Sequence, residues 1–321
     1  MVALGLALSS EEHGPRRLVD LAIAAEDAGF DFVSISDHYH PWLRDQGHSP
    51  FVWSVLGAIA ASTTRLGVGT GVTCPIMRTH PAIVAQAAAT TSLLLPGRFV
   101  FGVGSGEALN EHILAGRWPP AEIRLEMLEE AIALIRDLWT GESITHYGRY
   151  YTVEDARIFD APEQEPPIVV SAFGPLAAKL AARSGDGLWM STPDSDVAKQ
   201  FFSEGGAGPV FGQISCCYDD DVATASKIAH QYWRTAGVPG QLSQDLPTVA
   251  HFEMASSNIS VDKMPELMPC GPDLDPIVEK ARDAIETGVD HLYFHQIGPR
   301  QDEFLRVWRD ELGERIAAVA A

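Results

Sequence analysis

The densest group of chemically active side chains in the first third of the sequence directly follows a short apolar run at residues 32–35. Asp37, His38, His40 and Trp42 lie there within one short loop. Histidine exchanges protons near neutral pH, a carboxylate can hold a ligand or the local backbone, and tryptophan offers a flat wall for a planar ring. The apolar run is typical of a buried strand, and in parallel α/β proteins ligands bind at the carboxyl ends of strands. The loop is therefore the first candidate for a catalytic site.

Two other interpretations of this loop are open. A polar loop that contains one buried, hydrogen-bonded histidine needs no function at all. A His38-x-His40 pair at a barrel strand end is also typical of the paired zinc ligands of amidohydrolases. That pair normally follows the first strand and needs further histidines with a catalytic aspartate, whereas His291 and His295 on the last predicted strand have no acid closely after them. The sequence therefore favours proton exchange by His38 over a metal site.

A glycine-rich run at residues 102–111 is the second candidate. Its glycines alternate as GxGxG, which differs from the GxGxxG fingerprint of dinucleotide-binding folds. Glycines let the backbone come close to a ligand, and Glu107 and Asn110 present a carboxylate and an amide immediately after them. A flexible strand-to-loop turn without a ligand would have the same glycines.

Two shorter runs, at residues 70–75 and 171–175, also stand at the ends of predicted strands. The second of them places Gly174-Pro175 at the start of a helix, where free backbone amides can hold a phosphate. Taken alone, both runs fit the ordinary turn chemistry of a barrel.

The composition narrows the choice of partners and compartment. The chain of 321 residues has 43 acidic side chains against 23 Lys and Arg, a formal net charge of −20. Nucleic acids and anionic membranes bind clustered Lys and Arg, so this charge argues against both. No apolar run approaches the ~20 residues of a membrane span, and the first apolar stretch has no basic flank, which fits a strand better than a signal peptide. The four cysteines show no CxxC spacing, which indicates reduced thiols in a cytoplasmic protein.

The elements that must position these loops alternate regularly along the chain. Strands are predicted at residues 3–8, 31–35, 66–72, 99–103, 168–172 and 188–191, within 206–218, and at 291–295. Helices are predicted at 14–28, 51–61, 80–95, 122–139, from 174, from 219 to about 236, and at 276–287 and 302–318. Residues 108–120 are expected to form a surface loop, and residues 238–272 an insertion near the mouth of the site. The pattern predicts one domain over residues 1–321, a (β/α)8 TIM barrel with insertions at its carboxyl-end face.

Taken together, these motifs resemble the luciferase-like flavin and deazaflavin oxidoreductases. Within them the chain is most similar to the glucose-6-phosphate dehydrogenases that use the deazaflavin coenzyme F420. The matching segments are 36–42, 69–72, 102–111, 174–175, 185–187 and 290–295, in order along nearly the whole chain. The resemblance is specific because the Gly-Glu-Ala-Leu-Asn-Glu run occurs together with the Asp-His-x-x-Pro-Trp loop.

The resemblance implies a role for each matched residue. His38 takes the hydroxyl proton of the substrate, Trp42 helps to hold and shield the reacting pair, and Glu107 protonates or hydrogen-bonds the deazaflavin near a ring nitrogen. The residues implied to line the cofactor are Asp37, Gly71, Val72, Cys74, Ser105, Gly106, Glu107, Asn110, Ala172, Phe173, Gly174 and Pro175. Cys74 departs from the threonine that is usual in the family, and Phe173 replaces a glycine.

The resemblance further implies coenzyme F420 as cofactor, a cis peptide between Gly71 and Val72, and a homodimer. An F420-dependent alcohol or sugar dehydrogenase is the resulting prediction. An FMN-dependent monooxygenase of the same fold and a non-catalytic flavin-binding protein are the alternatives.

The substrate is predicted to be unphosphorylated. Relatives hold the sugar phosphate with basic residues, one of them a lysine where this chain has Asp194, and the later region has Lys263 as its single lysine. We expect a neutral hydroxylated substrate, either an unphosphorylated sugar or a larger apolar alcohol that lies against Trp42, Trp189 and Phe173.

Overall fold

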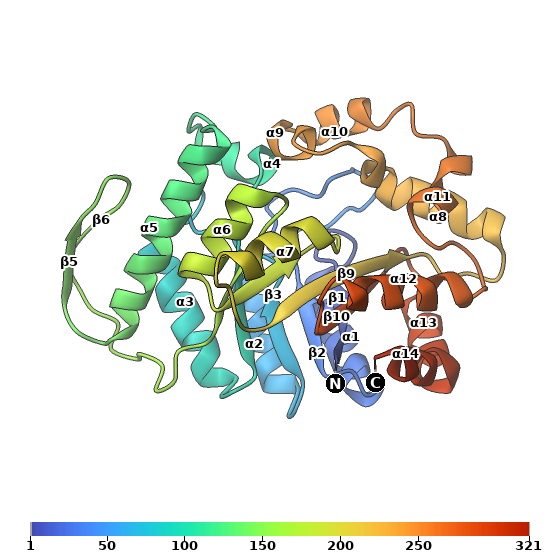
Figure 1. Cartoon of the computed structure of the whole chain (residues 1–321), viewed down its shortest axis with the longest axis horizontal. Coiled ribbons are helices and arrows are strands. Elements are labelled where there is room, and N and C mark those ends of the chain that lie inside the picture. The colour runs from blue at the N-terminus through green and yellow to red at the C-terminus, as the bar shows by residue number, and fades with distance from the viewer. Residues whose placement is uncertain (1, 321) are drawn as a thin grey trace.

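A closed barrel of eight parallel strands forms the centre of the computed structural model, which describes residues 2–320 (Figure 1). The strands are β1 (Ala3–Leu8), β2 (Phe32–Ile35), β3 (Gly67–Thr70), β4 (Phe99–Val103), β7 (Ile168–Ser171), β8 (Gly187–Met190), β9 (Val210–Cys216) and β10 (His291–Gln296). The barrel closes because β1 pairs in parallel with both β2 and β10. The predicted (β/α)8 barrel is confirmed.

Helices follow the strands and cover the outside of the barrel. They are α1 (Pro15–Asp27), α2 (Val52–Ser62), α3 (Pro81–Leu94), α5 (Ala121–Trp139), α6 (Pro175–Ser184), α7 (Ser195–Ser203), α8 (Val222–Trp233) and α12 (Asp275–Glu286), and after β10 come α13 (Gln301–Val307), a π-helical turn (Trp308–Leu312) and α14 (Gly313–Val319). A proline at the first turn starts α1, α3, α6 and α12, a position that suits its fixed φ and its missing N–H. The sequence pattern predicted these helices within a few residues, except for α7.

Aromatic side chains fill the inside of the barrel below its mouth. The Trp189 ring stacks on Phe211 with centroids 4.2 Å apart, and its Nε1 donates a hydrogen bond to the Tyr293 hydroxyl over 2.7 Å. The alternate glycines of strand three make room for it, since a Cβ on Gly69 would lie 3.0 Å from the indole and one on Gly71 2.9 Å from it. The prediction that Trp189 lines the substrate site is therefore wrong, because this side chain is only 1% exposed and closes the barrel interior.

Three segments differ from the simple alternation of strands and helices. Part of the predicted surface loop at 108–120 is instead a buried helix, α4 (Ala108–Glu111), followed by a 3₁₀ turn (His112–Leu114). An antiparallel hairpin that was not predicted, β5 (Ile144–Tyr147) with β6 (Thr152–Ala156), projects beside α5 (Figure 1).

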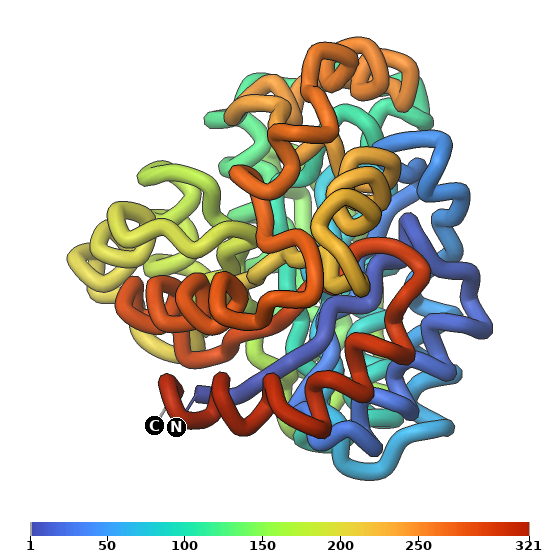
Figure 2. Tube along the Cα trace, turned by 90° about the vertical axis from the view of Figure 1, so that its right-hand side faces the viewer, coloured from blue at the N-terminus to red at the C-terminus, as the bar shows by residue number. Residues whose placement is uncertain are grey.

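The third segment, residues 238–272, will be called the roof. It contains α9 (Leu242–Asp245), α10 (Val249–Ala255), a 3₁₀ turn (Val261–Lys263) and α11 (Met264–Leu267), and a 3₁₀ turn (Arg234–Gly237) joins it to α8. Both views place α9 and α10 at the end of the molecule opposite the two chain termini (Figures 1 and 2). The roof thus has short helices where the sequence showed no periodicity.

Candidate active site

The carboxyl ends of the strands surround a cavity of about 980 Å³. The loops after the barrel strands form its floor and sides, and residues of the roof contribute to its wall. The residues of the predicted site that line it are Asp37, His38, Trp42, Gly71, Val72, Cys74, Ser105, Gly106, Glu107, Phe173, Gly174 and Pro175. The structure thus brings together segments that lie far apart in the sequence, while Asn110 and Ala172 lie behind the cavity wall.

His38 stands between two carboxylates. Its Nδ1 lies 3.2 Å from Oε1 of Glu11, and its Nε2 lies 3.4 Å from Oε1 of Glu107. The Glu11 carboxylate is buried, and its second oxygen accepts hydrogen bonds from the hydroxyls of Ser9 at 2.9 Å and Ser36 at 2.7 Å. A carboxylate held in this way orients the imidazole, so that Nε2 points toward Glu107 at the cavity.

Asn110 fastens the histidine loop to the loop after β4. Its side-chain oxygen accepts hydrogen bonds from the backbone N–H of Tyr39 at 2.7 Å and of His40 at 2.9 Å, and its amide group donates to Glu107. His40 adds a contact between its Nδ1 and the Leu109 carbonyl oxygen at 3.1 Å. Asn110 is only 1% exposed, so it positions the two candidate catalytic side chains and does not line the cavity.

A buried charge cluster supports the same two loops from below. Arg78 donates to Oδ1 of Asp37 over 2.9 Å, and its backbone N–H donates to Oε2 of Glu111 over 2.6 Å. The hydroxyl of Thr73 donates to the other oxygen of Asp37 over 2.9 Å. The pKa of Arg78 is raised, because its two carboxylate partners outweigh the cost of burial. Arg78 therefore stays charged and joins the loops after β2, β3 and β4.

Several glycines line the floor of the cavity at positions where the surrounding protein leaves no space for a side chain. The Gly71–Val72 peptide is cis, as the resemblance implied. A Cβ on Gly71 would lie 2.1 Å from Oγ of Ser34, and one on Gly104 would lie 2.8 Å from the Val72 side chain. Gly106 has φ +68°, and a Cβ there would lie 2.5 Å from the sulfur of Cys74. A flat ring can approach this backbone closely, which side chains would prevent.

The sulfur of Cys74 belongs to this floor as a packing group. The side chain is buried, and burial raises the pKa of its thiol well above the usual value. The thiolate is the reactive form of cysteine, so Cys74 is an inert thiol at neutral pH.

The segment after β7 supplies a helix N-terminus to the cavity. Gly174 precedes α6 without a side-chain cap, so the first backbone amides of the helix are free to bind an anion. Phe173 is 65% exposed beside this turn, whereas Ala172 is buried and donates its N–H to the Trp189 carbonyl oxygen over 3.0 Å. Ala172 thus fixes the turn from behind and does not line the cavity.

One wall of the cavity is aromatic. The Trp42 ring meets the His38 ring edge-on at 5.0 Å and the ring of Phe252 from the roof at 4.9 Å. Trp42 therefore lies between the His38 imidazole and the roof.

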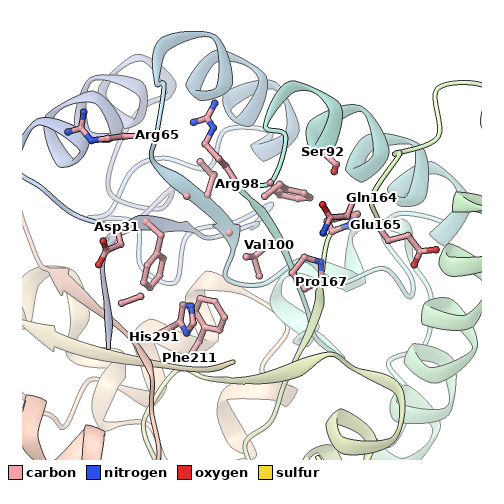
Figure 3. Close-up of a pocket in the computed structure, with 18 residues that line it drawn as sticks. Asp31, Arg65, Ser92, Arg98, Val100, Gln164, Glu165, Pro167, Phe211 and His291 are labelled. Carbon is pink, nitrogen blue, oxygen red and sulfur yellow. The ribbon is translucent and has the colours of Figure 1, made fainter. Parts of the chain in front are cut away.

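A second, smaller cavity of about 500 Å³ lies at the amino ends of the strands, near Phe211 and His291 (Figure 3). Its two arginines are already engaged by backbone carbonyls. Arg98 donates to the Leu66 carbonyl at 3.0 Å, and Arg65 donates to that of Glu26. Because its cations serve the backbone and its mouth lies away from His38, we assign the chemistry to the cavity at the carboxyl ends.

Comparisons with known proteins identify the family of the chain. A sequence model of the luciferase-like monooxygenase family matches residues 2–319. The chain belongs to the luciferase-like monooxygenase family.

Among its curated relatives are the F420-dependent glucose-6-phosphate dehydrogenases of Microbacterium testaceum (strain StLB037) and Nocardia farcinica (strain IFM 10152), each 35% identical. The alignments cover 97% and 99% of this chain and 96% and 98% of the relatives. A solved structure, an F420-dependent secondary alcohol dehydrogenase in complex with an F420-acetone adduct, is 28% identical and superposes with a TM-score of 0.90. That likeness covers 100% of this chain and 99% of the other.

Some side chains of this luciferase-like site were not predicted from the sequence. Glu11 and Arg78 hold the candidate catalytic loops, and Glu111 completes their buried cluster. The available signal was two adjacent acids, Glu11 and Glu12, directly after the first strand, since acids at a strand end of a barrel stand near the site. Nothing in the local sequence of Arg78 indicates its two partners.

Two absences hold for the part of the chain that the structure describes. In residues 2–320 no group of three or more His, Cys, Asp or Glu side chains is arranged to hold a metal ion. Across the same residues, every helix is too short or too polar to cross a membrane.

The Glu111 carboxyl predicts a pH dependence of stability. Burial raises its pKa to about 7 and outweighs the opposing hydrogen bond and charge of Arg78. The folded protein therefore binds more protons than the unfolded chain between the ordinary pKa of 4.5 and about 7, so stability falls as pH rises through this window. Glu111→Gln has no carboxyl group that titrates at this position. As the pH rises through the window, the free energy of unfolding of wild type should therefore fall by about 1–3 kcal/mol relative to that of the variant.

Denaturant unfolding of both proteins between about pH 4.5 and 8 measures this difference. Glutamine keeps an acceptor for the Arg78 N–H, so the comparison isolates the titration. Parallel pH profiles for the two proteins would contradict the prediction.

Proposed function

We propose that this protein is an oxidoreductase that depends on coenzyme F420 and moves a hydride between the coenzyme and the carbon that bears the hydroxyl or carbonyl group of an alcohol or sugar. The observation that carries the proposal is the position of His38, with Nδ1 on buried Glu11 and Nε2 toward Glu107 in one cavity. The names of the relatives, F420-dependent dehydrogenases of a sugar phosphate and of a secondary alcohol, support the same cofactor and reaction class.

The residues present fit a deazaflavin with a phosphate-bearing tail. At Gly71, Gly104 and Gly106 the surrounding protein leaves no room for a side chain, and the backbone there is open to close approach by a planar ring. The N-terminus of α6 offers uncapped amides for a phosphate. Asp37, Val72, Cys74, Ser105, Phe173 and Pro175 complete the proposed lining, and Asn110 and Ala172 act from behind it. When bound, F420 accepts or gives the hydride.

The chain's own side chains manage the proton. Oxidation of an alcohol requires that its hydroxyl proton leave, and Nε2 of His38 is the group placed to take it. The Glu11 carboxylate then stabilises the imidazolium from the other side of the ring. Glu107 lies next to Nε2 and, held by Asn110, is available to share a proton or a hydrogen bond with the reacting groups. Trp42 covers them against water.

A neutral substrate fits the charges of the cavity better than a phosphorylated one. Among residues 2–320, its lining contains the cations Arg124 and Lys280 and the carboxylates of Glu11, Asp37, Glu107, Glu111 and Asp283. Arg124 is 1% exposed and donates to the Pro119 carbonyl at 2.8 Å and to Gln244 at 2.9 Å, so little of it is free. Phosphate near neutral pH is normally held by several charge-assisted hydrogen bonds from Lys or Arg.

Asp194 and Lys263, on which the prediction of an unphosphorylated substrate was based, both lie outside the cavity lining. Asp194 is exposed outside the cavity lining and caps α7 by accepting hydrogen bonds from the N–H groups of Asp196 and Val197. The chain therefore lacks the lysine that its relatives have at this position, but the Asp194 carboxylate does not line the site. Lys263 also lies outside the lining.

Reduction of F420, followed as loss of the absorbance of its oxidised form, tests the proposed function. A panel should contain neutral secondary alcohols, glucose and glucose 6-phosphate, each with F420 and with FMN. We expect turnover with F420, and a kcat/KM for the best neutral substrate at least roughly tenfold above that for glucose 6-phosphate. Oxygen consumption with FMN would support a monooxygenase instead, and F420 binding without any turnover would support a binding protein.

Replacement of His38 tests the proton assignment. His38→Ala should lose ~10²–10⁴-fold in kcat, the usual effect of a general base, while F420 affinity measured by fluorescence titration is retained. His40→Ala is the matched control, because this neighbouring histidine lies outside the cavity lining and should keep most of the activity. Full activity of His38→Ala would refute the assignment.

We also propose that the chain is a single domain, works as a homodimer and is cytoplasmic.

The homodimer is supported by apolar side chains that are exposed on neighbouring helices. They are Ile83, Leu93 and Leu94 on α3 and Phe51 before α2. The four free cysteines, Cys74, Cys216, Cys217 and Cys270, fit a reducing compartment. Light scattering at micromolar concentration should give twice the mass of the chain, and a monomer mass would contradict the dimer.

A further inference from the structure

The two adjacent acids after β1 hold two different histidines at the same cavity. β1 lies between β2 and β10 in the barrel, so its loop faces the ends of both neighbours. Glu11 turns to His38 after β2, as described above. Glu12 turns the other way, and its Oε1 lies 3.0 Å from Nε2 of His295 at the end of β10. The proposed proton chemistry uses only the first of these pairs.

The Glu12–His295 pair is built as firmly as the first. Its side chains are 1% and 3% exposed. Oε2 of Glu12 accepts the N–H of Gly298 over 2.7 Å, and Oε1 also accepts the indole N–H of Trp233. Burial alone would raise the pKa of Glu12, but the hydrogen bonds from His295, Trp233 and Gly298 together hold that pKa below its usual value. An ionised carboxylate therefore faces Nε2 of His295.

The Glu12 carboxylate fixes the orientation of the His295 ring. Because Nε2 is turned to Glu12, Nδ1 is the ring nitrogen that remains on the side of Ser215 and the cavity. The nearest group to Nδ1 is the hydroxyl of Ser215, at the long distance of 3.5 Å. Ser215 pairs in register with His295 across β9 and β10, and its Oγ accepts a hydrogen bond from Gln213 Nε2 over 3.1 Å. The contact between Ser215 and His295 is at the outer limit of hydrogen-bond length, so a closer partner in the cavity can replace it.

Gln213, Ser215 and His295 line the same cavity as His38, whereas Glu12 stands behind them. We propose that these three side chains, oriented by Glu12, form a second subsite that binds a further neutral hydroxyl group of the substrate. The preferred substrate is then a diol or polyol rather than a simple alcohol. This inference rests on the proposed function and specifies its substrate class.

A hydroxyl is the group that matches this set of donors and acceptors. It can donate to Nδ1 of His295 and accept from Ser215 or Gln213 at the same time. A carboxylate or phosphate only accepts, and it would bring a negative charge close to the buried carboxylate of Glu12. An alkyl group would leave these polar atoms without partners, and sites that hydrogen-bond a substrate hydroxyl discriminate strongly against analogues that lack it.

The test compares alcohols that share a carbon skeleton. Isopropanol is compared with glycerol, and cyclohexanol with a cyclohexanediol, each with F420 in wild type, Ser215→Ala and Glu12→Gln. We expect wild type to prefer the polyol roughly tenfold or more in kcat/KM, mainly through KM. Both variants should lose most of that preference, because their kcat/KM for the polyols falls toward that for the simple alcohols. His291→Gln is the matched control, because His291 lies on the same strand at the far end of the barrel and should change neither ratio.

Nitrogen NMR of labelled histidines gives a readout that does not need turnover. In wild type His295 should carry its proton on Nε2, glycerol should shift its Nδ1 signal, and Glu12→Gln should abolish the single tautomer. Equal kcat/KM for polyol and simple alcohol in wild type, or an Nδ1-protonated neutral His295, would overturn the subsite. Failure of every alcohol to reduce F420 would refute the proposed function, and the NMR titration with glycerol would still decide the subsite.

Discussion

The mouth of the barrel depends on keeping several carboxylates buried without leaving any of them unpaired. Removal of a carboxylate from water is costly, and the cost is offset only when hydrogen bonds and opposite charges surround it. Here Glu11 has two serine hydroxyls and His38, Asp37 has Thr73 and Arg78, and Glu12 has His295 with two N–H donors. These partners come from different strand ends, so the same hydrogen bonds that stabilise the charges also fix the loops to one another.

The relative stiffness of the two catalytic loops follows from this arrangement. Asn110 takes two backbone N–H groups of the histidine loop, and Arg78 reaches the carboxylates of Asp37 and Glu111. His38 and Glu107 thus belong to one cross-linked body, although they come from different loops. The position of the His38 imidazole is therefore set by contacts within the protein.

The sequence predicted the features that have a local cause. Apolar runs gave the barrel strands, and prolines at first turns gave the starts of α1, α3, α6 and α12. The loop of His38 and the glycine run ending in Glu107 were found because reactive side chains follow strands directly.

Features with a long-range cause were missed or misjudged. Trp189 lies in the barrel because Gly69 and Gly71 on another strand leave space for it. Residues 108–111 are buried because Asn110 and Glu111 meet the histidine loop and Arg78, which local polarity cannot reveal. The roles of Glu11 and Glu12 likewise depend on which histidines the neighbouring strands bring to them.

The roof differs from the barrel in the kind of side chain that it contributes to the cavity. Val238, Gly240, Gln241, Ser243, Gln244, Phe252, Leu267 and Met268 are its contributions to the cavity lining. These contributions shape the space above the substrate but, within the described chain, include no group that titrates near neutral pH. The histidines and carboxylates of the lining therefore come from outside the roof. Changes in this single stretch of chain would reshape one wall of the cavity and leave His38 and Glu107 in place.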